Sequence, residues 1–534
     1  MTSFTNAKVF TGTGPQEFAE AFTVQDGRFT WVGAAADLRE SDSVDLRGAT
    51  VLPGLLDVHQ HPSMLAELVD SVVLLQPRVG SVAEMLEVLG THPNLGKGPD
   101  AWVEGFGHNE SGYPEGTPTR HDLDKVSTTQ PVYCLRADVH TAVCNSFLLD
   151  LAGITADTPD PDGARFGRFP DGTPNGVLEE FAAIEAVTRL KPVPDADEWV
   201  RRIVALGEHY GRLGLTTLDD LLASHTPDSL QTFRRAAEAG FAQRVGLFWK
   251  WDPTHGLPDL TDDDRTGDVR VAGVKVITDG AYSNRTAWTV DPYPGTCDHG
   301  YPTVSVADMA DAVAWARRNG VQAAIHAMGD AAISLVIDTF ADDEPWLTDR
   351  PSIRIEHCTL VSPAMLDRVE AARMRFGLVS HTIFLFAEYG SYETNLSPAQ
   401  FEIAYPIRSF YERAPFTALA SDAPATAWVD ADNPFPSVQA AVLRRAHNGA
   451  DIGQKEAVTV GQALELYTGR AAACTTASNV GTIEEGRDAD FVVLDRDIFT
   501  VDPHLIDEVR VTETWLRGRR VWPTAPVTDP SNHR

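Results

Sequence analysis

The middle of the chain alternates short apolar runs with longer stretches in which apolar residues recur at helical spacing. Each apolar run has the length of a buried strand, and an amphipathic stretch follows most of them. This alternation is typical of a parallel sheet built from strand–helix units. The strands predicted in this way are residues 51–58, 214–218, 244–250, 271–277, 321–326, 352–357, 375–380 and 416–421.

Helices are predicted in the intervals between these strands. Ser305 followed by Asp308 is typical of a helix N-terminus, because the hydroxyl and the carboxylate can cap free backbone N–H groups. The predicted helices are residues 198–212, 306–318, 331–341, 364–373 and 436–447. Eight such units in succession predict an α/β fold, a (β/α)8 barrel.

Three parts of the chain do not follow this rhythm. Residues 62–197 contain many Pro, Gly and Asp residues, and we interpret them as an inserted substrate-side subdomain between the first and second units of a barrel over 53–474. Residues 1–52 and 475–534 show short strand-like runs separated by turn residues. We predict that both termini form one small composite β-sandwich; the alternative is two unrelated β extensions.

Composition limits the possible partners. The 534 residues are 43% hydrophobic, enough for a large core, and the net charge is -32. A strongly acidic surface repels nucleic acid and anionic membranes, so we expect neither as a partner. Five cysteines without a C-x-x-C pair suit free thiols in a reducing cytoplasm. We see no basic-then-apolar leader and no run of about 20 apolar residues, and therefore expect a cytoplasmic protein.

The triplet His59–Gln60–His61 closes the first predicted strand. Residues i and i+2 of a strand point to the same side, so both imidazoles would face one way at the strand's end. Two neighbouring neutral imidazoles are half of a metal site. The pair by itself is ambiguous, since a structural histidine pair is equally compatible with this pattern.

Further polar residues fall at the same ends of other strands. Lys275 lies in the fourth strand, His326 ends the fifth, His357 ends the sixth, and Asp422 follows the eighth. Each could be a core or capping residue when taken singly. In a (β/α)8 barrel, however, the C-terminal ends of the strands meet at one rim, where the chemistry takes place. Four imidazoles, an amine and a carboxylate at one rim predict a divalent metal site.

These residues lie in motifs that resemble the amidohydrolase superfamily of metal-dependent hydrolases. The motifs are PGLLDVHQH at 53–61, GLTTLDD at 214–220, IHAMGD from Ile325, IEHC from Ile355, SDAP from Ser421 and GRDADFVVLD at 486–495. A second set is similar to the branch that includes N-substituted formamide deformylases. It comprises GFGHNE at 105–110, DLDKV at 122–126, VKVITDGAYSNRTA at 274–287 and ALELYTGRAA at 463–472. The resemblance covers nearly the whole chain.

The resemblance implies a set of metal ligands and a cofactor. One or two divalent ions are expected, with zinc as the expected metal, although manganese, iron or cobalt could replace it. In many members a strand-four lysine is carboxylated and bridges two metals, and Lys275 stands at that place; an unmodified lysine with one metal is the alternative. The implied metal ligands are His59, His61, Lys275, His326, His357 and Asp422.

The implied reaction is hydrolysis of an amide-type C–N bond of a small molecule, such as an N-substituted formamide. Metal-activated water would attack, Asp422 would act as general acid and base, and His357 and Lys275 would complete the catalytic set. An ester, lactone or carbamate hydrolase on the same site is an alternative. A deaminase is disfavoured, because such relatives carry a glutamate where this chain has Gly329. An inactive binding scaffold is also disfavoured, because every expected ligand position is retained.

Substrate contacts are predicted from position alone. The loop after strand four should lie at the catalytic rim, as should the residue that follows strand seven. The insertion contributes one further candidate. The predicted substrate-binding residues are Asp279, Tyr282, Ser283, Arg285, Trp288, His381 and His140. The oligomeric state is left open, with a homodimer as one option.

Overall fold

The computed structural model describes residues 1–38, 42–137, 139–161, 164–226 and 228–524. The chain divides into two compact units. The first combines Met1–Met64, Trp199–Asp422 and the chain from Asp432 onward, and the second combines Leu65–Glu198 with Ala423–Ala431. The last ten residues of the predicted terminal segment, 525–534, lie outside the described residues.

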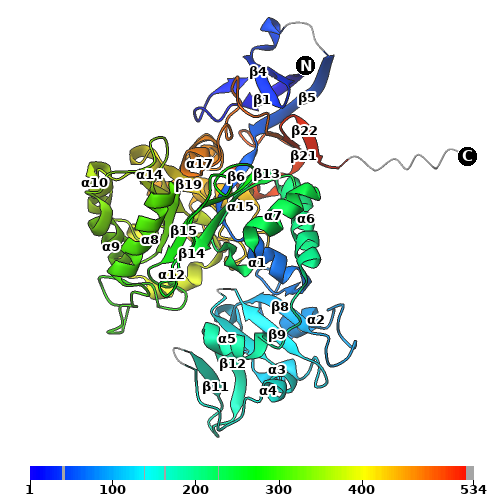
Figure 1. The fold of residues 1–534 in the computed structure, drawn as a ribbon, viewed down its shortest axis with the longest axis vertical. Coiled ribbons are helices and arrows are strands. Elements are labelled where there is room, and N and C mark those ends of the chain that lie inside the picture. The colour runs from blue at the N-terminus through cyan, green and yellow to red at the C-terminus, as the bar shows by residue number, and fades with distance from the viewer. Residues whose placement is uncertain (39–41, 138, 162–163, 227, 525–534) are drawn as a thin grey trace, which may run out of the picture. The chain divides into compact units, whose positions relative to one another are not determined.

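A parallel sheet forms the centre of the first unit (Figure 1). Its eight strands within the described residues are β6 Leu55–Gln60, β13 Leu215–Asp220, β14 Arg244–Lys250, β15 Val269–Ile277, β16 Gln322–Ala327, β17 Ile353–His357, β18 Phe376–Ser380 and β19 Thr417–Leu419. Each strand pairs with the next in sequence order. They are buried on both faces, which explains why they appear in the sequence as continuous apolar runs.

The backbone of Leu466 and Tyr467 spans the gap between the first and last strands. The N–H of Leu56 in β6 donates to the carbonyl of Tyr467 at 2.9 Å, and the N–H of Leu419 in β19 donates to that of Leu466 at 3.0 Å. The sheet is therefore a nearly closed barrel. The predicted barrel and its strand order are confirmed.

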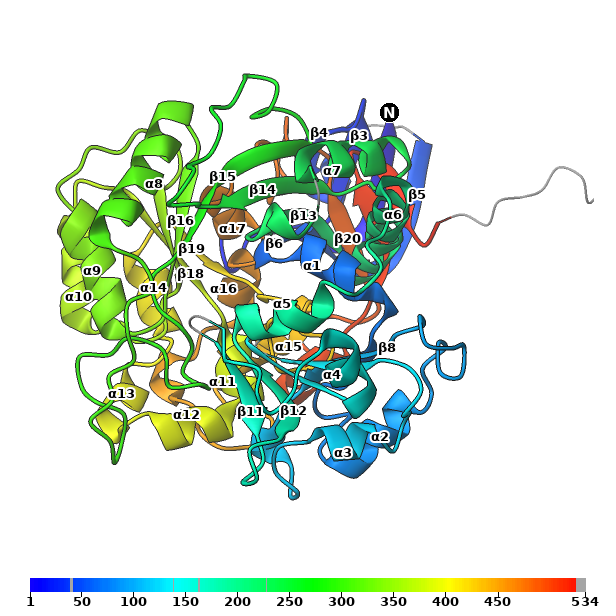
Figure 2. The same cartoon turned by 60° about the horizontal axis from the view of Figure 1, so that its bottom comes forward.

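Helices pack on the outer face of this barrel, as Figure 2 shows for α8, α9 and α10. α8 begins where the Ser305 hydroxyl accepts the N–H of Asp308 at 3.1 Å, and it ends at Gly320, whose φ is 65°. α1 Pro62–Glu67 and α6 Ala196–Leu213 each include residues of both units. The helices that lie wholly within the described residues of the first unit are α7 Ser229–Glu238, α8 Val306–Asn319, α9 Asp330–Phe340, α10 Pro363–Ala371, α11 Thr382–Ala387, α12 Tyr389–Asn395, α13 Pro398–Glu402, α14 Ile407–Arg413, α15 Pro434–Leu443, α16 Val460–Glu465 and α17 Gly469–Cys474.

Two local predictions were wrong. Residues 51–53 do not belong to the first barrel strand but end β5, Asp42–Pro53, and Gly54 separates β5 from β6. The third strand is followed by turns over residues 251–268 instead of a helix. That segment contains Pro, Gly and six aspartates, which favour turns over helix propagation.

Strands from both ends of the chain join one sheet in the first unit. They are β1 Thr2–Phe10, β2 Phe18–Ala19, β3 Ala21–Gln25, β4 Arg28–Gly33, β5, β20 Phe491–Leu494, β21 Val511–Leu516 and β22 Arg519–Trp522. β20 runs antiparallel to β5, with Phe491 opposite Pro53. Figure 1 shows these N-terminal and C-terminal strands side by side. The arrangement as a two-layer sandwich, and its separation as a domain, stay predictions.

The second unit has its own mixed sheet. Its strand order is β11 Arg165–Arg168, β12 Pro174–Glu179, β10 Thr141–Cys144, β9 Val132–Arg136, β8 Val103–His108 and β7 Val72–Val73, and its helices are α2 Val82–Leu89, α3 Arg120–Leu123, α4 Ser146–Ala152 and α5 Phe181–Thr188. Residues 423–431 join this unit from far along the chain, and the Val429 N–H donates to Gln76 at 2.8 Å. The substrate-side role of this unit stays a prediction. Across the described chain, no helix combines the length and apolar character needed to cross a bilayer.

Candidate metal centre

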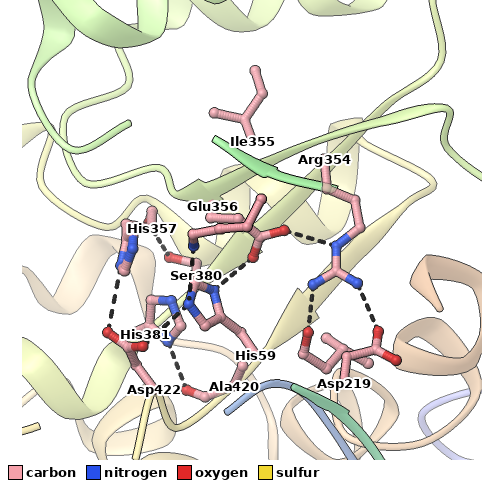
Figure 3. A network of polar contacts seen from close by, with 12 residues as sticks. His59, Asp219, Arg354, Ile355, Glu356, His357, Ser380, His381, Ala420 and Asp422 are labelled. Carbon is pink, nitrogen blue, oxygen red and sulfur yellow. Dashed lines mark hydrogen bonds and ion pairs between the residues drawn. The ribbon is translucent and has the colours of Figure 1, made fainter. Parts of the chain in front are cut away.

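Four imidazoles and one carboxylate converge where β6, β17, β18 and β19 end, and all five side chains are buried. Figure 3 shows His59, His357 and His381 beside Asp422. His59 Nε2 lies 3.1 Å from Asp422 Oδ1, and His61 Nε2 lies 2.8 Å from the same oxygen. The rings of His59, His357 and His381 have centroids 4.8 to 4.9 Å apart. Two groups with metal-ligand spacing result, His59–His61–Asp422 and His59–His357–His381, which share His59.

The local backbone explains how four of these side chains reach the cluster. His59 and His61 share a side because they are two residues apart at the end of β6. His357 follows Glu356, so strict alternation would direct it to the other face of β17. Its φ of 71° interrupts the alternation and brings its ring to the cluster. Asp422 also has a left-handed backbone, with φ 56°, and its N–H donates to the His59 carbonyl at 2.8 Å.

The hydrogen bonding of His59 creates a place for a cation. His59 Nδ1 lies 2.7 Å from Glu356 Oε2, and a carboxylate only accepts, so Nδ1 carries the ring proton. Nε2 is then the ring nitrogen left to bind a cation, and it faces Asp422 Oδ1, a second acceptor. Within the described structure, His357 Nδ1 and His381 Nε2 are also buried without a hydrogen-bond partner. This donor set fits a divalent metal.

The electrostatics of the cluster favour ligands with free lone pairs. Burial lowers the pKa of His61, places that of His357 well below its ordinary value, and lowers that of His381 to about 3. Burial alone would raise the pKa of Asp422, but attraction to His59 and hydrogen bonds from His59 and His61 outweigh it and hold that pKa well below its usual range. At neutral pH the cluster therefore offers neutral imidazoles at His61, His357 and His381 and a carboxylate anion at Asp422.

Comparison with known proteins agrees with this chemistry. The family described as "Amidohydrolase family" matches residues 42–522. The chain belongs to the amidohydrolase family. The predicted resemblance is confirmed, and family membership supports hydrolysis as the class of reaction.

This amidohydrolase is similar to the N-substituted formamide deformylase of Arthrobacter pascens, with 29% identity over 96% of each chain. It is 27% identical to protein LONG AFTER FAR-RED 3 of Arabidopsis thaliana, over 97% of this chain and 91% of that protein. A solved structure of an uncharacterized metal-dependent hydrolase from Pyrococcus horikoshii shares the fold, with a TM-score of 0.74, 24% identity, and coverage of 94% and 99% of the two chains.

Two predicted ligands of this amidohydrolase lie beside the cluster. Lys275 is buried in β15, with Nζ 3.4 Å from His59 Nε2, and burial lowers its pKa to about 8 against the opposing charges of Glu356 and Asp422. His326 is outside both metal-spaced groups. Its Nε2 lies 3.1 Å from the Gly280 carbonyl and 3.3 Å from an Asp279 oxygen, so binding through that nitrogen requires the ring to turn.

The loop after β15 is held by Asp279. Its carboxylate accepts the N–H groups of Met328, Gly329 and Trp288 at 3.0, 2.8 and 2.9 Å. These bonds tie the loop to the start of α9, so the visible role of Asp279 is to fix the loop that carries the other candidates.

The other predicted substrate residues differ in accessibility. Tyr282 is fully buried, Ser283 and Trp288 are partly exposed, and Arg285 is exposed and donates to Asn395 Oδ1 at 2.8 Å. His140 lies in the second unit, with Nδ1 3.1 Å from Glu180 Oε2. Substrate contact by these residues stays a prediction.

Sequence reasoning missed two features of the centre. It considered His381 only for substrate binding, which stays a prediction, and did not foresee that its ring lies beside those of His59 and His357. It also passed over Arg354 and Glu356, which precede His357. The available signal was a pair of charged residues two apart in an otherwise apolar strand, because such residues must find partners inside the barrel.

We expect a fall in pH from 7 to 5 to reduce the free energy of unfolding of the metal-free wild type more than that of the metal-free His381→Gln variant. The pKa of His381 is about 3 when folded and ordinarily 6.5, so the unfolded chain takes up a proton that the folded chain excludes. The stability from neutral His381 is therefore present above pH 6.5 and lost as pH falls, by about 2 kcal/mol at pH 5. Urea unfolding of both proteins at pH 7 and pH 5 measures this difference. Equal losses of unfolding free energy in the two proteins would show that His381 is not the buried group that excludes the proton.

Proposed function

We propose that this amidohydrolase cleaves an amide-type C–N bond of a small molecule, with N-substituted formamides as the substrate class. One observation carries the proposal: in the buried cluster, His59 Nε2 and His61 Nε2 both lie close to the same oxygen of Asp422. The similarity to a formamide deformylase over almost the full length of both chains supports the choice of substrate.

The proposed cofactor is one or two divalent ions, with zinc first, held by His59, His61, His357 and Asp422. His381, His326 and Lys275 are the candidates for further ligands. When bound, the metal would act as a Lewis acid toward the substrate carbonyl and the attacking water. The lowered pKa of Lys275 favours the neutral amine that carboxylation requires, so a carboxylated Lys275 belongs to the two-metal form of the proposal.

In the proposed reaction, Asp422 moves the proton. Its pKa keeps it ionised at neutral pH, so Asp422 can accept a proton from the attacking water. The same carboxyl would then deliver that proton to the leaving nitrogen, which departs as a neutral amine. His357, neutral and buried, would face the oxyanion that forms on the substrate.

The backbone at Gly329 argues against a deaminase. This is the position where deaminases of the superfamily carry a catalytic glutamate. A Cβ at Gly329 would lie 1.8 Å from the Trp288 carbonyl oxygen, so no side chain fits unless the loop moves. The glycine instead brings its N–H within 2.8 Å of Asp279.

A matched substrate series tests the proposal. One amine is presented as its formamide, acetamide and carbamate, and the corresponding alcohol as its formate ester, to the purified protein loaded with zinc. We expect the formamide to give the highest kcat/KM, chelation to abolish its hydrolysis, and elemental analysis to find one or two ions per chain. Hydrolysis of the ester alone, or full activity without divalent metal, would refute the proposal.

A further inference from the structure

A continuous chain of charged groups crosses the interior of the barrel and ends on His59 (Figure 3). Arg354 in β17 donates from Nη1 to Asp219 Oδ2 in β13 at 2.7 Å and from Nε to Glu356 Oε1 at 2.8 Å. The other oxygen of Glu356 accepts from His59 Nδ1 at 2.7 Å. All four side chains are buried. Because β17 is not adjacent to β6 or β13 in the sheet, these contacts span the barrel interior.

The same arginine also holds the backbone next to His59. Its second terminal nitrogen donates to the carbonyl of Val58, the residue immediately before His59. Thr475 donates to the remaining oxygen of Asp219 at 2.9 Å, which fixes the far end of the chain. Both the ring of His59 and the strand that carries it are therefore set by one buried ion-pair system.

We propose that Glu356 is a positioning residue that fixes the tautomer and ring orientation of His59, and that Arg354 and Asp219 hold Glu356 in place. The inference rests on the proposed function, because it concerns how His59 presents Nε2 to a metal. A carboxylate at Nδ1 keeps the proton on that atom and leaves Nε2 as the ligand lone pair. Such supporting groups commonly change metal affinity by about 10–100-fold.

The substitution Glu356→Gln isolates this effect with almost no change of volume. Arg354 Nε can only donate, so it selects the single amide oxygen of the glutamine. The amide NH2 then faces His59 Nδ1, which must become an acceptor. The ring proton is displaced to Nε2, the atom that faces Asp422. Glu356→Gln is thus expected to invert the tautomer of His59 while the fold is kept.

Zinc affinity of the full-length variants, measured by competition with a chromophoric chelator, tests the chain. We expect Glu356→Gln to weaken zinc binding by about 10–100-fold, and Asp219→Asn, which acts on Glu356 only through Arg354, to weaken it by less than Glu356→Gln does. Asp219→Asn/Arg354→Met/Glu356→Gln removes the donor that selects the amide oxygen, so the amide can turn toward His59. We expect this triple variant to bind zinc more tightly than Glu356→Gln, a rescue that general destabilisation cannot produce.

A second measurement does not depend on the variants or on zinc. In metal-free wild-type protein with ¹⁵N-labelled histidine, the His59 ring, assigned by loss of its signals in His59→Gln, is expected to carry its proton on Nδ1. A His59 ring without a proton on Nδ1 would overturn the inference, as would wild-type zinc affinity in Glu356→Gln. If the wild type binds no divalent metal, the proposed function fails. The positioning role of Glu356 is judged separately, because the tautomer of His59 is measured in the absence of metal.

Discussion

Replacing Asp422 by Asn is expected to reduce kcat/KM for the amide substrate by about 10³-fold or more. The substitution removes the carboxylate that His59 Nε2 and His61 Nε2 approach to 3.1 and 2.8 Å. An amide cannot accept and return the proton of the attacking water, and it is a poorer partner for a divalent cation. Zinc content should fall together with activity. Steady-state kinetics on zinc-loaded protein, with zinc measured in the same sample, check this expectation.

A matched control is available elsewhere in the first unit. Asp432 is also a buried aspartate that pairs with a histidine, with Oδ2 2.5 Å from His209 Nε2, and it is outside both metal-spaced groups. Asp432→Asn is expected to leave kcat/KM within about threefold of the wild type, because it touches none of the reacting groups. Retention of full activity by folded Asp422→Asn would refute the mechanism.

Replacing Arg354 by Met is expected to lower the free energy of unfolding by about 3–5 kcal/mol at neutral pH. The methionine fills much of the space of the arginine stem, but it leaves the carboxylates of Asp219 and Glu356 buried without their shared cation. An uncompensated buried charge costs far more than the loss of an exposed ion pair. Chemical unfolding followed by circular dichroism measures the change.

Arg413→Met is the control for this prediction. Arg413 also bridges two carboxylates, Asp367 and Glu370, at 2.7 and 2.8 Å, but at the protein surface. Solvent screens that pair, so we expect a change of about 1 kcal/mol or less. The cost of Arg354→Met should also shrink as pH falls from 8 to 5, because Asp219 and Glu356 can then take up protons. Equal effects of the two substitutions would show that burial of the charges is not the cause.

Much of the barrel could be predicted because buried parallel strands have a recognisable sequence pattern. A strand covered on both faces appears as a continuous apolar run, and a polar residue at its end stands out. The shared orientation of His59 and His61 could also be predicted, because residues i and i+2 of a strand point to the same side. These features depend on neighbouring residues along the chain, which a sequence pattern can capture.

Other features depend on contacts between distant segments. Gly54 divides one apolar run between two sheets, and the run itself does not show where one sheet ends. Residues 423–431 pack with a unit that starts more than 200 residues earlier. The turn at Asp422 is placed by its backbone bond to His59, which no local pattern records.

The sequence by itself determined the strand–helix succession, the histidine pair and the set of polar residues that end the barrel strands. Only the tertiary structure decided which of them meet. A positive φ turns His357 to the cluster against the alternation of its strand, and His381 joins it from β18. Arg354 and Glu356 were plain in the sequence as charges in a buried strand, but their partners lie across the barrel in β13 and β6. Charges buried in a protein interior must be paired, and the closure of the barrel selects the partner.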